Sequence, residues 1–181
     1  MIQQIAKKLI DNGIFIIPLL PNEKYNGDRD ILTKEYKVSD LIPKGNLGIN
    51  LKKSNLYCVD LDTEDAIYFG NLWLPHNTRI HGRINNGVKQ QTHFYFKSDG
   101  SIKENIKNRG VVDFLIDHNV VVFGQTKNKH SKLLMRRYIA KESHLCTFNE
   151  SFLAAYNKVC FAAALAPHLK LLNANDTALK L

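Results

Sequence analysis

The chain has 181 residues, of which 44% are hydrophobic and 23% are charged. This length suits one well-buried domain with a small appendage and is short for two full domains, and the composition excludes a largely disordered chain. Lys and Arg number 25 against 17 Asp and Glu, a net charge of +8 that favours an anionic partner, nucleic acid first.

The cysteines and the N-terminus bear on the compartment. The three cysteines are scattered and lack the paired spacing of a zinc site, so no disulfide framework is expected and a reducing cytoplasm fits best. Lys7, Lys8 and Asp11 interrupt the apolar residues of the N-terminus, and no small-residue cleavage site follows. We therefore expect neither a signal peptide nor a membrane span.

The first fifty residues predict a helix-strand unit with a further strand. Apolar residues at helical spacing over 2–12 predict a helix, and the apolar run 14–18 predicts a short buried strand. A polar loop follows, then a short helix at 37–46 that is broken by a proline. The run 47–50 predicts the next strand, bounded by turn residues.

The central segment predicts strands around one helix. The apolar run 56–61 predicts a strand that leads into Asp62, and Thr63 then supplies the cap of a helix that includes 66–72. The segment 78–97 reads as strand, glycine-bearing turn and strand, with His93 on the second strand.

Two β-branched runs and an alanine-rich segment complete the chain. The runs 110–116 and 119–124 predict a hairpin around the turn-like residues between them, with Asp113 inside the first strand. From Glu150 onward the sequence predicts helices interrupted at Pro167, with a frayed tail after residue 173.

The strongest chemical feature is Asp60-Leu61-Asp62. Side chains alternate along a strand, so both carboxylates project to one side while Leu61 is buried on the other. Two acids this close repel each other unless a hard cation such as Mg²⁺ or Mn²⁺ neutralises them. The alternative is structural, with one acid ending the strand and the other capping the next helix. His93 and Asp113, both on apolar strands, favour a functional set.

The order acid-x-acid, histidine strand, third acid and β-rich run resembles the archaeo-eukaryotic primase superfamily. It is most similar to the bifunctional primase-polymerase domain of plasmid and phage replication proteins, or of other mobile elements. The resemblance begins with the opening helix, the strand IIPLLPNEK and NLGINL before LYCVDLD. It continues through TRIHGRINNG and THFYF to VDFLIDHNVVVFGQT and so covers most of the chain.

This resemblance implies a nucleotidyltransferase that extends a 3′-hydroxyl on a DNA template. By it, Asp60, Asp62 and Asp113 are the catalytic acids and bind two ions of Mg²⁺ or Mn²⁺. His93 contacts the phosphates of the incoming NTP or dNTP, and Lys24 and Arg83, which we place on glycine- or asparagine-rich loops, are further nucleotide or template contacts. The implied partners are template DNA, single-stranded or as primer-template, and a helicase domain or protein, with no membrane.

The chain departs from the family pattern around these residues. Leu115 stands where an arginine commonly follows the third acid, and residues 123–126 replace a proline-rich turn. Residues 90–92 replace the glycine pair that precedes the histidine. The departures leave the acids of the metal site in place and describe a divergent or specialised member.

Two other functions remain open. A rolling-circle replication initiator, a nickase, needs a tyrosine nucleophile such as Tyr138 or Tyr156 and usually two alternating metal-binding histidines, but Gln91 occupies the second histidine's place. A non-catalytic module for single-stranded nucleic acid needs only the basic surface and exposed aromatic side chains. The candidates for that stacking role are Tyr25, Tyr36 and Tyr95.

We expect an α+β fold with a mixed or antiparallel sheet of the RNA-recognition type flanked by helices. The catalytic domain is expected over 1–149, with an N-terminal α/β part at 1–50 and the metal-site sheet at 51–149. A helical C-terminal segment follows at 150–181. The cleft is expected between the two parts, with the acids and His93 on its floor.

Overall fold

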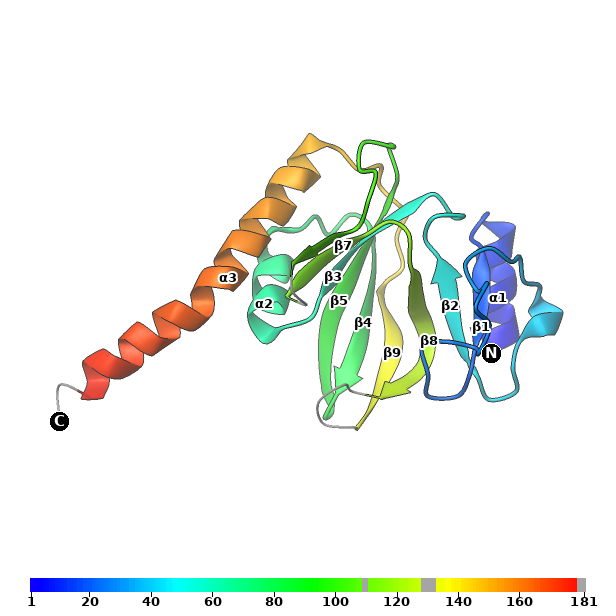
Figure 1. Cartoon of the computed structure of the whole chain (residues 1–181), viewed down its shortest axis with the longest axis horizontal. Helices are drawn as coiled ribbons and strands as arrows, with labels where there is room; N and C mark the ends of the chain where they lie inside the picture. Colours follow the sequence, from blue (N-terminus) through cyan, green and yellow to red (C-terminus); the bar gives the residue numbers. More distant parts are fainter. Residues whose placement is uncertain (109–110, 128–132, 179–181) are drawn as a thin grey trace.

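A computed structural model describes residues 1–108, 111–127 and 133–178, with side chains to residue 170. The fold is α+β, as expected, and consists of a curled sheet with helices on both sides (Figure 1). In chain order the elements are α1 (Ile2–Asp11), β1 (Ile16–Leu19), the 3₁₀ helix η1 (Val38–Asp40), β2 (Asn46–Asn50), β3 (Leu56–Leu61), α2 (Glu64–Trp73), β4 (Arg79–Asn85), β5 (Val88–Lys97), β6 (Ile106–Asn108), β7 (Val112–Leu115), β8 (Asn119–Lys127), β9 (Leu134–Lys141) and α3 (Glu150–Ala178).

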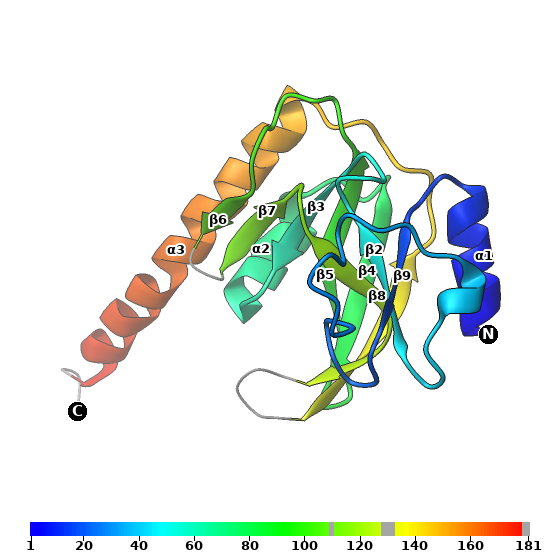
Figure 2. The same ribbon diagram turned by 45° about the vertical axis from the view of Figure 1, so that its right-hand side comes forward.

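Within the described residues, every pair of neighbouring strands in the sheet is antiparallel. The nine strands among the described residues lie in the order β1-β2-β8-β9-β4-β5-β3-β7-β6, so β8 and β9 connect the N-terminal strands to the centre of the sheet. The strands β1 and β2 therefore extend the same sheet that carries Asp60. The curl is visible in Figure 2, where β8 and β9 turn away from β3 and β7.

The sheet bends where β8 changes partners. Its first half, to Phe123, pairs with β2, and its second half, from Gly124, pairs with β9. Gly124 has a φ of 109°, and a Cβ there would collide with the side chain of Asn46. Asn46 in turn accepts a hydrogen bond from the backbone N–H of Gln125 (2.9 Å) and donates one to the backbone oxygen of Glu23 (2.9 Å). Only glycine fits this corner without strain.

Each face of the sheet has its own core. One face packs against α2 and α3 and contains Val59, Leu61, Phe94 and Phe114. The other face, inside the curl, contains Cys58, Tyr95, Leu115 and the β8 valines 120 and 122, and α1 covers it with Ala6 and Leu9. Figures 1 and 2 show α1 and α3 on opposite sides of the sheet. The alternation along β3 thus divides its residues between two cores.

Two expectations about the elements are wrong. The strands β7 and β8 do not form a hairpin, since β7 pairs with β3 and β6 while β8 pairs with β2 and β9. The apolar faces of β7 and β8 are buried against different partners, which overrides their closeness in sequence. The helix α3 also continues through Pro167. The proline lies beyond Ala166, the last buried residue of α3 with a described side chain.

Two strands were missed, and no membrane span is found. The strand β6 has three residues, and β9 carries adjacent arginines that obscure its alternation. In the described part of the chain no helix is long and apolar enough to cross a bilayer.

Candidate functional site

The end of β3 positions the two acids of the DLD motif. Asp60 lies in the strand, on the face that also carries Cys58, while Leu61 is fully buried on the other face. Asp62 follows the strand directly, is exposed and donates its backbone N–H to the oxygen of Val111 (3.1 Å). Thr63 then caps α2 by accepting from the N–H of Ala66 (3.2 Å). A buried strand and a capped helix thus fix the backbone on both sides of the carboxylates.

The strand register places Asp60 between His93 and Asp113. Asp60 is directly opposite His93 on β5 and directly opposite Asp113 on β7. Residues opposite each other in antiparallel strands point to the same face of the sheet. The structure therefore brings these three predicted residues side by side, and Asp62 adjoins them at the end of β3.

His93 is buried and held through both ring nitrogens. Its Nε2 lies 3.2 Å from Oδ1 of Asp60, and its Nδ1 lies 2.8 Å from the hydroxyl of Thr92. Burial, together with the charge of Arg137, lowers the pKa of His93 well below its usual value, so the ring is neutral. A neutral ring satisfies both contacts when Nε2–H donates to Asp60 and Nδ1 accepts from the Thr92 hydroxyl.

The acids occupy an environment that disfavours their negative charge. Burial raises the pKa of Asp60, although the charges of Arg137, Lys24 and Arg83 oppose this effect. Burial and the neighbouring Asp60 raise the pKa of Asp62 to about 6. A raised carboxylate pKa in a cluster of like charge is the condition that a bound cation relieves.

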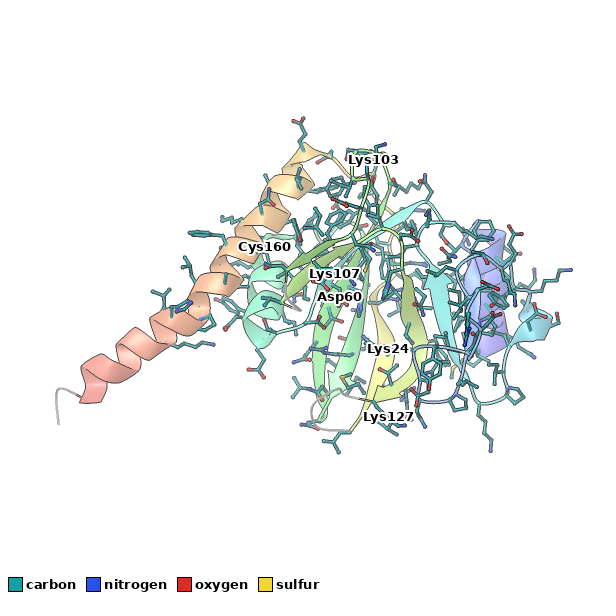
Figure 3. The ribbon with its side chains drawn as sticks, viewed as in Figure 1. Lys24, Asp60, Lys103, Lys107, Lys127 and Cys160 are labelled. Carbon is teal, nitrogen blue, oxygen red and sulfur yellow. The ribbon has the colours of Figure 1, made fainter. Side chains whose placement is uncertain are left out.

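Two predicted basic residues face the acids. Arg83 donates from Nη2 to the backbone oxygen of Asp62 (3.0 Å), and Lys24 is exposed with its backbone oxygen held by Asn119 (2.7 Å). The charge of each acts on both Asp60 and Asp62. In the view of Figure 3, Lys24 and Asp60 are labelled over the same region of the sheet, with Lys24 below Asp60. Arg83 lies inside β4, which corrects its expected position on a loop.

Arg137 on β9 is a site residue that the sequence reasoning missed. Its side chain is 6% exposed, and its Nε and Nη1 atoms have no hydrogen-bond partner among the described residues. It lies opposite Arg83 in register and is the strongest cationic influence on Asp60. The sequence shows two adjacent arginines, which must face opposite sides of a strand, but does not show which is buried; in the structure Arg136 is the exposed one. A buried guanidinium with free donors is suited to an anion.

The donor set fits a hard divalent cation in chemistry, although its side chains are not gathered around one point. Three carboxylates on neighbouring strands provide the oxygen ligands that Mg²⁺ and Mn²⁺ prefer. However, Asp113 directs Oδ1 to the backbone N–H of Asn108 (3.0 Å), and Asp60 faces His93. No group of three or more His, Cys, Asp and Glu side chains close enough for a metal ion occurs among the residues described. Two-metal binding stays a prediction.

The tyrosines proposed for the alternative functions lie in different environments. Tyr95 is 1% exposed, so its expected role as a stacking platform is wrong. Tyr156 is buried in α3, and burial raises its pKa further, which makes it a poor nucleophile. Tyr36 is half-buried and bonds to Asp28 (3.3 Å), whereas Tyr25 is 55% exposed. Tyr138 is partly buried on β9, with Lys89 over its ring.

Comparisons with known proteins add no family to this geometry. No protein-family model matches the sequence. No curated protein matches it significantly either.

Proposed function

We propose that the chain is a primase-polymerase that transfers nucleotides to a 3′-hydroxyl on a DNA template. The observation that carries the proposal is the register of β3, which aligns Asp60 with His93 on one side and Asp113 on the other. Support comes from the buried Arg137, whose free donors lie near these acids. Carboxylates for metal ions beside cations for phosphate are the groups that nucleotidyl transfer requires.

Each residue has a role in this proposal. Asp60, Asp62 and Asp113 would hold two Mg²⁺ or Mn²⁺ ions, which lower the pKa of the attacking hydroxyl and stabilise charge on the transferred phosphoryl group. Arg137 and Lys24 bind the triphosphate of the incoming NTP or dNTP through charge-assisted hydrogen bonds. His93 orients the Asp60 carboxylate through its Nε2–H, and because both of its ring nitrogens are already bonded, the phosphate contact that the resemblance implies for it would require one of these bonds to break.

The proposal includes an RNA-recognition type of sheet within the larger one. The strands β7, β3, β5 and β4 are neighbours in that order, and α2 connects β3 to β4. This order and the antiparallel pairing support that type of sheet, with α3 on the face that a second helix would cover. The N-terminal α/β part at 1–50 would then form the other wall of the cleft.

Nucleotide incorporation tests the proposal directly. Wild-type protein is incubated with Mg²⁺ or Mn²⁺, NTPs or dNTPs, and template with or without a primer, and products are resolved on a denaturing gel. Incorporation is expected, and Asp60→Asn and Asp113→Asn should each reduce it by about 10²-fold or more, since loss of a ligand exceeds the 10–100-fold effect of a supporting residue. Glu64→Gln is the control, because Glu64 is an exposed acid four residues from Asp60.

A nucleic-acid-binding module without catalysis is the second candidate. It is favoured by the net charge of +8 and by the absence of a gathered metal-ligand group in the described residues. Under this alternative, wild-type protein binds single-stranded DNA but incorporates no nucleotide with either metal. That outcome would refute the primase-polymerase proposal.

A further inference from the structure

The sheet opens between β8 and β9 on the side of α1. β8 and β9 pair with each other over Gly124–Lys127 of β8. Before Gly124, β8 pairs with β2, and beyond the pairing with β8 the strand β9 continues along β4. A cavity of about 170 Å³ lies in the opening. Its apolar walls come from α1, β8 and β9 and include Leu9, Val122 and Ile139.

A buried histidine without partners lines this cavity. His81 on β4 is 4% exposed, and neither of its ring nitrogens has a hydrogen-bond partner among the described residues. Burial lowers its pKa to about 3, so the ring is neutral and offers one donor and one acceptor. The buried Nε of Arg79, which also lines the cavity, has no partner there either. Unsatisfied buried polar atoms are costly, which indicates that something polar occupies the cavity.

Charged residues surround the cavity and give it a positive balance. Glu142 accepts hydrogen bonds from Lys8 on α1 and from Nη2 of Arg79 (3.4 Å). Two cations and one carboxylate leave one net positive charge beside an otherwise apolar space. This charge favours an anionic ligand over a neutral one of the same shape.

From these observations we infer that the cavity is a binding site for a small monoanion with a ring-sized apolar body, such as an aromatic carboxylate. A cavity of about 150 Å³ holds one benzene ring in another protein, so this volume suits a single ring whose carboxylate is directed toward Arg79 and His81. The ring packs against the apolar walls, while the carboxylate accepts hydrogen bonds from Arg79 and the His81 ring. Water alone would satisfy His81 but would leave the apolar walls wet.

The site is separate from the acids on β3 but lies close to them. The ring of Tyr95 packs edge-on against His81 (centroids 4.9 Å apart), and its other neighbour is the His93 ring (6.4 Å). The ring of Tyr95 therefore lies between His81, which the ligand would contact, and His93, the hydrogen-bond partner of Asp60. Binding itself requires neither metal nor nucleotide, so it is tested without the proposed activity.

Benzoate is the probe for this inference. The full chain is labelled with ¹⁵N at histidine, and the His81 ring signals are followed as sodium benzoate is added in the absence of metal and nucleotide. A saturable shift of His81 is expected, with weaker binding of neutral benzyl alcohol. No saturable change at His81, or equal affinity for the two compounds, would overturn the inference.

Paired variants on α1 locate the site. Lys8→Gln removes a positive charge beside the cavity and should weaken benzoate binding about two- to fivefold, the range of an exposed ion pair. Lys7→Gln is the matched control, since Lys7 is exposed and bonds to Asp11 instead. Ile5→Trp places a larger side chain in the cavity lining and should abolish binding. Unchanged affinity in Lys8→Gln and Ile5→Trp, with folding confirmed by circular dichroism, would contradict the site.

Discussion

Asp62 as a residue is exposed to solvent at the end of β3, yet the protein around its carboxyl group partly desolvates it, and this desolvation and the charge of Asp60 raise its pKa. Asp60 shares this condition and receives only partial relief from His93 and Arg137. A bound cation would relieve this repulsion, which agrees with the proposed metal site.

The metal-free protein should therefore lose stability as its acids ionise. The folded pKa of Asp62, about 6, is above the unfolded value of 3.8, so the folded state holds the proton more tightly and stability falls as pH rises from about 4 to 6. Asp62→Asn should reduce this fall and be more stable than wild type above pH 6, but not below pH 4. Urea unfolding with EDTA at pH 4, 5, 6 and 7 measures the difference. A pH-independent difference would contradict the assigned pKa.

Arg137 makes a second prediction at this scale. If its free donors bind the triphosphate, Arg137→Met should weaken nucleotide binding about 10- to 100-fold, the effect of losing hydrogen bonds to a charged group. Arg137→Lys should restore part of the affinity, since the charge returns without the planar fork. Fluorescent-nucleotide titration measures both, and Arg136→Met is the control, because its exposed side chain points to the other face. Equal losses in the two methionine variants would argue against a specific role.

The strand β8 decides how the elements are arranged. It joins the N-terminal strands to the site by changing partners at Gly124, and Asn46 of β2 fills the corner with hydrogen bonds. The same partner change leaves the opening in which the His81 cavity lies. One backbone feature thus determines both the curl of the sheet and the position of a cavity.

Alanine substitutions at Gly124 and Gly87 distinguish a steric collision at the bend of β8 from the ordinary cost of a positive φ in a turn. Gly124→Ala combines a positive φ with a collision against Asn46, whereas Gly87→Ala has a positive φ of 79° in open space. Gly87→Ala should cost about 1 kcal/mol and Gly124→Ala about 2 kcal/mol or more. Chemical denaturation measures the two losses. A smaller loss at Gly124 than at Gly87 would show that the corner tolerates a side chain.

The whole molecule carries a net charge of +8, and part of it lies near the lower end of the β4–β5 hairpin and β9. Lys89 is exposed there with its Nζ 5.8 Å from the centre of the Tyr138 ring, and Arg136 is exposed on β9. Positive charge beside an aromatic ring suits single-stranded nucleic acid, whose bases stack and whose phosphates attract cations. The strand register places Lys89 and Arg136 on the face of the sheet opposite to Arg137, so this surface is separate from the proposed site.

Salt titration tests this surface at the molecular scale. Binding of a fluorescent single-stranded oligonucleotide should weaken linearly in a plot of log affinity against log salt concentration. Lys89→Ser and Arg136→Ser should each lower the slope by about 0.7, the value for one phosphate contact on a single strand. Lys7→Ser on α1 should leave the slope unchanged. Equal slopes in all three variants would place the nucleic-acid surface elsewhere.

The sequence by itself determined most of the local elements, although β6 and β9 were missed, and it placed Asp60 and Asp62 at the end of a buried strand. Alternation along β3, the cap at Thr63 and the turn before β5 depend on neighbouring residues, and the structure has them as predicted. The alternation follows from hydrophobic periodicity, and the cap and the turn follow from single local residues, so a short segment of sequence is enough to predict them.

Only the tertiary structure decided the partners of β7 and β8, the continuity of α3 through Pro167, and the burial of Tyr95, Arg137 and His81. These properties depend on which distant strands bury a given face, and a polar residue in a strand has no local mark that separates a buried position from an exposed one. Whether the acids of β3 gather around metal ions also depends on side-chain placement across two strands. For that reason the sequence identifies the carboxylates, whereas the fold adds the buried Arg137 near them.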